Sequence, residues 1–442
     1  MKADIVFKLS FYLLLFTLFI LPLPIGSNRP WAWSVFEILI AATSILTVLT
    51  TQSRALFAPF KHILPILVPI ILLQVWTVAQ ILPVGNGPIS NDINQSEISL
   101  LKGLSYCLFI ACCAWHLTDK NKVTTFCYTL ISAAAFQALY ATYLQYSGES
   151  HSPVFGMQLS NRAAGSFVYP NHLANYLLIG VSLTIGFLIS QLTRRNKSAN
   201  LKRQLMSVFD ALLSSKWLIR VSIICIVVAL ILTRSRMGNA AFFVSLVATS
   251  LLALWLMKRP PRVLKWLVLS FIVLDIAIVG ALFGIEKVKE RVDSTSFESE
   301  TRDDVVALSI PLIQDKWLTG TGAGTFYTAF PQVHHYTIHG LYDHAHNEYI
   351  QFAVEYGVIP TLILGLMVLY CLYSAVRALK ERRDSFYQGL AFGCLMAIIA
   401  MLMHIAVDFP LQAPATTVNF IAVLVLAVIC KTQTHQKQFL VK

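Results

Sequence analysis

The chain has 442 residues, of which 56% are hydrophobic and only 13% are charged. A soluble domain carries about 25% charged residues, so a chain of this length and composition could not cover itself with polar side chains in water. The formal net charge is +12, from 34 Lys and Arg against 22 Asp and Glu; in a membrane protein such an excess indicates topology before it indicates a nucleic-acid partner, and we expect none.

Apolar stretches long enough to cross a bilayer, which takes about 20 helical residues, occur twelve times along the chain. They lie at approximately 5–25, 31–49, 63–82, 99–117, 123–146, 172–192, 217–233, 238–257, 264–284, 349–370, 386–407 and 415–430. The sequence therefore predicts an all-α integral membrane protein of about twelve transmembrane helices. The first stretch is too long for a signal peptide and no small-x-small cleavage site follows it, so we expect it to be retained.

Lys and Arg are distributed unevenly between the two faces of such a bundle. If the twelve helices alternate, 24 of the 34 Lys and Arg lie on the side that holds both termini, and 10 lie on the other. Because cytoplasmic loops are enriched in Lys and Arg, we expect both termini to be cytoplasmic. The opposite, outer face is then the one that carries the longest connection, residues 285–348.

This long outer loop is expected to be partly helical. Residues 300–317 mix charges with apolar side chains and predict an amphipathic surface helix that is interrupted near Pro311. The following GTGAGTF segment, residues 320–326, resembles a phosphate-binding loop. It lacks the Lys-Ser/Thr of such a loop and has no strand before it, which favours a flexible hinge over a nucleotide site.

Histidines are concentrated at the end of the same loop. Five of the eleven fall within thirteen residues: His334, His335, His339, His344 and His346. They could ligate zinc, with Asp343 beside His344 and His346. They could also be polar residues at a wet membrane interface, where Asn347 caps the next helix, or they could include a catalytic base.

The position of His346 favours the catalytic interpretation for that residue. It stands at the N-terminal end of the helix that becomes the predicted span 349–370. The positive end of a helix disfavours an imidazolium ion, which would keep the ring neutral and ready to accept a proton. The same helix end also attracts anions.

Four arginines are expected on the outer face, close to hydrocarbon: Arg162, Arg234, Arg236 and Arg302. Arginine at this depth is costly without a partner, which makes each a functional candidate, although a side chain of this kind can also extend to lipid headgroups. Arg234 and Arg236 stand out because headgroup contact does not require two arginines at one tight turn.

Acidic residues inside predicted spans are also candidates, because a carboxylate in a membrane is usually functional or paired. They are Glu37, Asp275 and Glu355. Glu355 follows His346 by nine positions, about 13 Å along a helix, which is too far to orient that ring directly. Asp408 lies near His404 at an outer helix end, where it either orients a site residue or makes an ordinary interfacial hydrogen bond.

The segment His346-Asn347, nine residues, then Gly357-Val358-Ile359 resembles the signature of the O-antigen ligase and O-antigen polymerase superfamily. The family pattern ends in Gly-x-x-Gly, and Pro360 stands here in place of the second glycine. Four more segments resemble the family in the right order: RAAGSFVYPNHLANYL (162–177), LTRSRMGN (232–239), ETRDDVVALSIPLIQDKWLTGTGAGTF (300–326) and HIAVDFPL (404–411). The resemblance covers about residues 160–411.

The resemblance implies an inverting glycosyltransferase of the bacterial inner membrane. It would move a glycan from undecaprenyl diphosphate to an acceptor hydroxyl on the periplasmic face, without a cofactor or a metal. Arginine suits the diphosphate leaving group because its fork binds phosphate twice and stays charged, and the acceptor hydroxyl needs a general base.

Each candidate residue then has a role. His346 is the expected catalytic base. The expected diphosphate ligands are Arg234, Arg236 and Arg162. The expected supporting residues are Asn347, Arg302 and His344.

The predicted organisation has three regions: 1–150 with the first five helices, 151–411 resembling the family and including loop 285–348, and 412–442 with the last helix and a cytoplasmic tail. The acceptor stays open, since lipopolysaccharide ligation, repeat-unit polymerisation and transfer to a protein hydroxyl use the same donor chemistry. A secondary transporter is the alternative from another class. It would be expected to show internal repeats, and none is evident.

Overall fold

The structure is a computed structural model that describes residues 2–51, 56–83, 87–192, 216–258, 260, 296–333 and 342–432. Within these residues the chain is a bundle of α-helices and short 3-10 helices, and the one β-bridge, between His151 and Gln158, is isolated. The predicted all-α membrane class is confirmed.

In the described part of the chain, ten helices are long and apolar enough to cross a membrane. They are α1 (Lys2–Ile20), α2 (Pro30–Thr50), α4 (Leu64–Ile81), α5 (Ile93–His116), α6 (Lys120–Tyr146), α7 (Pro170–Leu192), α10 (Arg236–Leu256), α16 (Val358–Glu381), α17 (Ser385–His404) and α18 (Pro414–Thr432). The shorter apolar helix α9 (Lys216–Leu232) matches another expected span. The expected span 264–284 lies outside the described residues, so the count of twelve stays a prediction.

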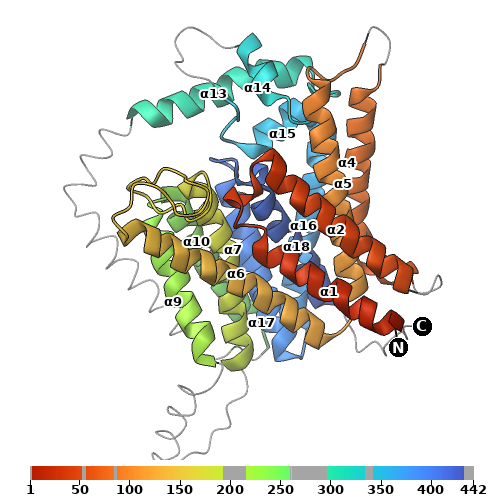
Figure 1. Cartoon of the computed structure of the whole chain (residues 1–442), viewed down its shortest axis with the longest axis vertical. Helices are drawn as coiled ribbons and strands as arrows, with labels where there is room; N and C mark the ends of the chain where they lie inside the picture. Colours follow the sequence, from red (N-terminus) through yellow and green to blue (C-terminus); the bar gives the residue numbers. More distant parts are fainter. Residues whose placement is uncertain are drawn as a thin grey trace, which may run out of the picture.

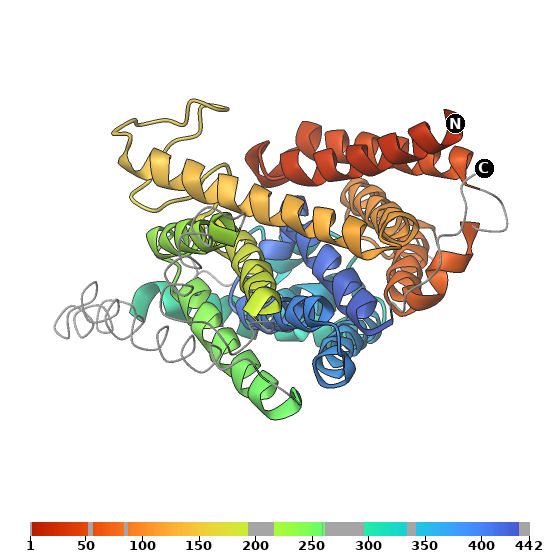
Figure 2. The ribbon, with the colours of Figure 1, turned by 90° about the horizontal axis from the view of Figure 1, so that it is seen from below.

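Helices α7, α17 and α18 form the enclosed centre of the bundle, with α1 and α2 along one edge (Figure 2). Glycines bring α7 and α17 into close contact. A Cβ atom on Gly389 would lie 2.4 Å from the Gly186 carbonyl oxygen, and one on Gly393 would lie 2.7 Å from the Ser182 carbonyl oxygen. Small residues allow transmembrane helices to approach this closely, and the contact fixes how α7 and α17 are aligned.

One end of the bundle, here called the site end, carries the non-spanning helices at the top of Figure 1. These are α13 (Ser296–Asp315), α14 (Phe326–Ala329) and α15 (Glu348–Tyr356). Segments distant in the sequence meet there too: the Ser166 hydroxyl donates to the Pro22 carbonyl at 2.5 Å, and Gln80 Nε2 at the end of α4 donates to the Thr319 carbonyl at 2.8 Å. The site end is the predicted outer face.

Two sequence predictions about these helices are wrong. The expected span 349–370 is broken at Gly357, where φ is +86°, into α15 and the spanning helix α16. A Cβ atom there would lie 2.7 Å from the Leu318 carbonyl oxygen, so the break is a site of close packing that suits glycine. Helix α13 runs through Pro311 without the expected interruption.

Candidate functional site

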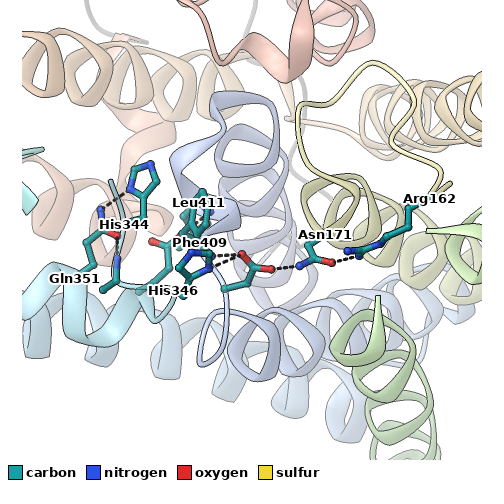
Figure 3. Close-up of polar contacts among 10 residues, drawn as sticks. Arg162, Asn171, His344, His346, Gln351, Phe409 and Leu411 are labelled. Atoms are coloured by element: carbon teal, nitrogen blue, oxygen red, sulfur yellow. Dashed lines mark hydrogen bonds and ion pairs between the residues drawn. The ribbon is translucent and has the colours of Figure 1, made fainter. Parts of the chain in front are cut away.

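A chain of polar side chains crosses the site end from His346 to Arg162 (Figure 3). His346 Nδ1 lies 3.9 Å from Asp408 Oδ1. Asn171 Nδ2 donates a hydrogen bond to Asp408 Oδ2, and Asn171 Oδ1 accepts one from Arg162 Nη2 at 2.6 Å. The structure therefore links the predicted base to one of the predicted arginines through two intermediate side chains.

Central helices of the bundle position this chain. Asn171 lies in the first turn of α7, and Asp408 follows the C-terminal end of α17. One turn further along α7, Asn175 Nδ2 lies 2.8 Å from His404 Nδ1 of α17. The contact between α7 and α17 at this level thus brings Asn171 close to Asp408.

The backbone at two predicted site residues is left-handed. Five non-glycine residues in the described segments have positive φ, and they include Arg234 at +49° and His346 at +51°. Such a conformation is uncommon outside glycine and costs of order 1–3 kcal/mol. The surrounding contacts must hold it in place at both residues.

The arginines at the turn between α9 and α10 lie beside Arg162. Arg162 Nε donates to the Thr233 carbonyl at 2.9 Å, directly before Arg234. Ser235 caps α10 by accepting a hydrogen bond from Gly238 N at 3.2 Å, and the side chains of Arg234 and Arg236 on either side of it are exposed.

Arg302 lies in α13, and its side chain is outside the described part of the structure. Its predicted supporting role therefore stays a prediction.

Phe409 is surrounded by three histidine rings. The His344 ring stacks on it with centroids 4.4 Å apart, and the His346 and His172 rings meet it edge-on at 4.7 and 4.9 Å. Burial lowers the pKa of His344 to about 4, helped by repulsion from His172 and His346. His344 is therefore neutral at physiological pH and acts as a packing partner.

Asp408 is almost fully buried, with 3% of its surface exposed. Burial alone would raise the pKa of its carboxyl group, but His404, His172 and the backbone N–H of Phe409 hold that pKa below its usual value. Asp408 is thus a carboxylate, placed to stabilise a positive charge on a neighbouring imidazole.

Asn347 has its predicted capping role. Its side-chain oxygen accepts hydrogen bonds from Tyr349 N at 3.1 Å and Ile350 N at 3.3 Å, at the start of α15. The residue after it, Glu348, donates its backbone N–H to the Ile405 carbonyl at 2.9 Å. These three hydrogen bonds fix the chain on the C-terminal side of His346.

The glycine-rich segment 320–326 is held in place by hydrogen bonds, so it is not the flexible hinge that was expected. The Glu355 carboxylate accepts hydrogen bonds from Gly324 N at 3.1 Å and Phe326 N at 3.4 Å. Gln80 Oε1 accepts another from Ala323 N at 3.2 Å. The backbone amides that resemble a phosphate cradle are thus partly occupied by a carboxylate of the chain itself.

No group of three or more His, Cys, Asp or Glu side chains is placed to hold a metal ion in the segments that the structure covers. Asp343, His344 and His346 therefore do not form the zinc site that was one interpretation of the loop. The other loop histidines, His334, His335 and His339, lie outside those segments.

Three residues of the site were not identified from the sequence: Asn171, Phe409 and Gln351. Asn171 and Phe409 lie within segments that resemble the family, YPNH and VDFPL, which is the signal that could have identified them. Gln351 is an ordinary helix residue in sequence, and only its side-chain contacts with Ala345, His344 and Glu355 distinguish it.

Residues 221–365 match the family model described as O-antigen ligase. The match includes Arg234, Arg236 and His346, whereas Arg162, Asn171 and Asp408 lie outside it. No curated protein and no solved structure matches the chain. Together with the all-helical membrane architecture, the match over residues 221–365 supports a relationship to the O-antigen ligase and polymerase superfamily.

Proposed function

We propose that this protein is an inner-membrane glycosyltransferase that moves a glycan from undecaprenyl diphosphate to an acceptor hydroxyl on the periplasmic face, as an O-antigen ligase does. The observation that carries the proposal is the polar chain from His346 through Asp408 and Asn171 to Arg162. It joins a proton acceptor to a phosphate-binding side chain at the end of the bundle that the charge distribution assigns to the periplasm.

His346 is the proposed general base. Its Nδ1 faces Asp408, which leaves Nε2 to accept the proton of the acceptor hydroxyl. As that proton leaves, the acceptor oxygen attacks the anomeric carbon and the bond from that carbon to the diphosphate oxygen breaks. The glycan is transferred with inversion, because the attack comes from the side opposite the leaving group.

Asp408 is proposed to stabilise the imidazolium ion that forms at His346 during the reaction. A buried carboxylate beside a catalytic histidine both orients the ring and favours its protonated form. Asn171 in turn orients the carboxylate, because it donates to Asp408 Oδ2 while its own oxygen is held by Arg162.

The arginines are proposed to bind the diphosphate. Negative charge grows on the phosphate oxygens as the glycosidic bond breaks, and preorganised guanidinium groups stabilise it without reorganisation. Arg162 bonds to the Thr233 carbonyl, directly before Arg234, so the proposed position of the diphosphate is at the α9–α10 turn, near Arg162, Arg234 and Arg236. No cofactor or metal enters this scheme.

The test is transfer by the purified protein in lipid nanodiscs, given an undecaprenyl-diphosphate-linked glycan and one acceptor at a time. Transfer to lipid A–core supports the ligase assignment. Extension of the carrier-linked glycan means a repeat-unit polymerase, and transfer to a protein hydroxyl means a protein glycosyltransferase. Absence of transfer with every acceptor, together with solute uptake into proteoliposomes, would contradict the proposal in favour of a transporter.

A further inference from the structure

The buried face of α15 carries three polar side chains that hold three different segments of the site end. Glu348, Gln351 and Glu355 are each 2% exposed or less. Glu348 Oε1 accepts from Leu411 N at 2.7 Å, which fastens the turn after Asp408. Glu355 fastens the glycine-rich segment, as described above.

Gln351 is the member of this set that reaches the segment of the predicted base. Its Oε1 accepts a hydrogen bond from Ala345 N at 3.2 Å, and its Nε2 lies 3.1 Å from His344 Nδ1. Nε2 also donates to Glu355 Oε1 at 3.0 Å. Every one of these contacts fits one orientation of the amide, in which the oxygen accepts and both N–H groups donate.

The contact between Gln351 and His344 determines the protonation state and the tautomer of the His344 ring. Since Gln351 Nε2 donates to it, His344 Nδ1 must be an acceptor, so the ring is neutral with its proton on Nε2. The ring then stacks on Phe409, which in turn meets the His346 ring edge-on. Gln351 is thus connected to His346 by two routes, through the backbone at Ala345 and through the stacked rings.

We propose that Gln351, itself oriented by Glu355, is a positioning residue that holds His346 in its strained left-handed backbone conformation and aims its ring. The inference rests on the proposed function, in which His346 is the base. A left-handed conformation at a non-glycine residue persists only where neighbouring contacts fix it. Gln351 supplies such contacts before His346, and Asn347 and Glu348 supply them after it.

The primary variant is Gln351→Leu, which keeps the approximate size of the side chain and removes all three contacts. We expect kcat to fall 10- to 100-fold while KM for the lipid-linked donor stays within about threefold, because a misplaced base slows the chemical step and the arginines are untouched. The matched control is Thr361→Val in α16, which removes a hydrogen bond to the Gly357 carbonyl of 2.8 Å without touching this network. It should leave kcat unchanged.

A readout without substrate separates this inference from the proposed function. Diethyl pyrocarbonate modifies neutral histidine rings, and mass spectrometry can follow the reaction in the peptide that contains His344 and His346. In Gln351→Leu we expect that peptide to react several-fold faster than in the Thr361→Val control. If wild-type protein transfers no glycan, the proposed function fails, and the modification rates still decide whether Gln351 holds this segment.

Gln351→Glu provides a second test should the leucine variant fold poorly. The carboxyl group that this substitution introduces can, when protonated, accept from Ala345 N and donate one hydrogen bond. When ionised it donates none and faces the carboxylate of Glu355. The activity of Gln351→Glu relative to wild type should therefore be higher at pH 6 than at pH 8. An unchanged ratio, or unchanged kcat and unchanged histidine modification in Gln351→Leu, would overturn the inference.

Discussion

Arg234 and His346 both hold a backbone conformation that glycine adopts without strain, yet neither position is occupied by glycine. The cost is of order 1–3 kcal/mol at each residue, and strain of this kind is often found at functional sites. It is consistent with the proposed roles of both side chains.

Replacement of Arg234 by glycine tests whether its side chain serves donor binding or the stability of the fold. Arg234→Gly relieves the strained backbone, so the melting temperature should stay the same or rise by a few degrees. KM for the lipid-linked donor should increase at least tenfold, because a bidentate phosphate ligand is lost. A thermal melt and donor titration in the same nanodiscs measure both effects, and a fall in stability with unchanged KM would show a structural role instead.

Replacement of Asp408 by asparagine removes the negative charge of the side chain and keeps its shape. In Asp408→Asn we expect kcat to fall by about two orders of magnitude or more, since the developing imidazolium ion loses its partner. The acidic limb of the pH–rate profile should move to lower pH, because an opposite charge beside a histidine favours its protonated form. An unshifted acidic limb would show that Asp408 does not act on His346.

The sequence predicted those candidate site residues that a local pattern marks, such as His346 before a helix and two arginines at one turn, and their roles stay predictions. It could not identify Asn171, Phe409 or Gln351 as parts of the same site. Their roles depend on side-chain contacts between α7, the turn after α17 and α15, and residue spacing along the chain does not encode those contacts.

At the scale of helices, the hydropathy pattern located the spanning segments well, because about 20 apolar residues in a row have few alternatives to a membrane span. It missed the break at Gly357, since α15 and α16 are both apolar enough to form one continuous pattern. The break arises from packing against the Leu318 carbonyl, which is a contact distant in sequence.

The close contact between α7 and α17 predicts a marked effect of Gly389→Ala. The added methyl group would meet the Gly186 carbonyl oxygen at 2.4 Å and the Ser190 nitrogen at 2.6 Å, both backbone atoms. We expect a loss of about 1–3 kcal/mol in stability and a loss of transfer activity, because Asn171 and Asp408 move apart. Gly365→Ala, where the added atom meets nothing within 4 Å, is the control and should behave as wild type.

At the scale of the whole molecule, the charge of +12 is interpreted as a signal of orientation. Cysteine labelling tests this orientation. Single cysteines are introduced at Asp343, on the site end, and at Arg383, between α16 and α17, and intact cells are treated with a membrane-impermeant maleimide. Asp343→Cys should be labelled once the outer membrane is permeabilised and Arg383→Cys only after the inner membrane is opened. The reverse pattern would invert the proposed topology.

The most direct test of the proposed mechanism is the rate of glycan transfer by His346→Ala in nanodiscs, with donor binding measured on the same sample. If His346 is the base that Asp408 and Gln351 hold in place, kcat falls by about two to four orders of magnitude while the donor still binds with nearly wild-type affinity. Transfer at the wild-type rate would contradict the proposed mechanism, because proton removal by His346 would then have no part in the reaction.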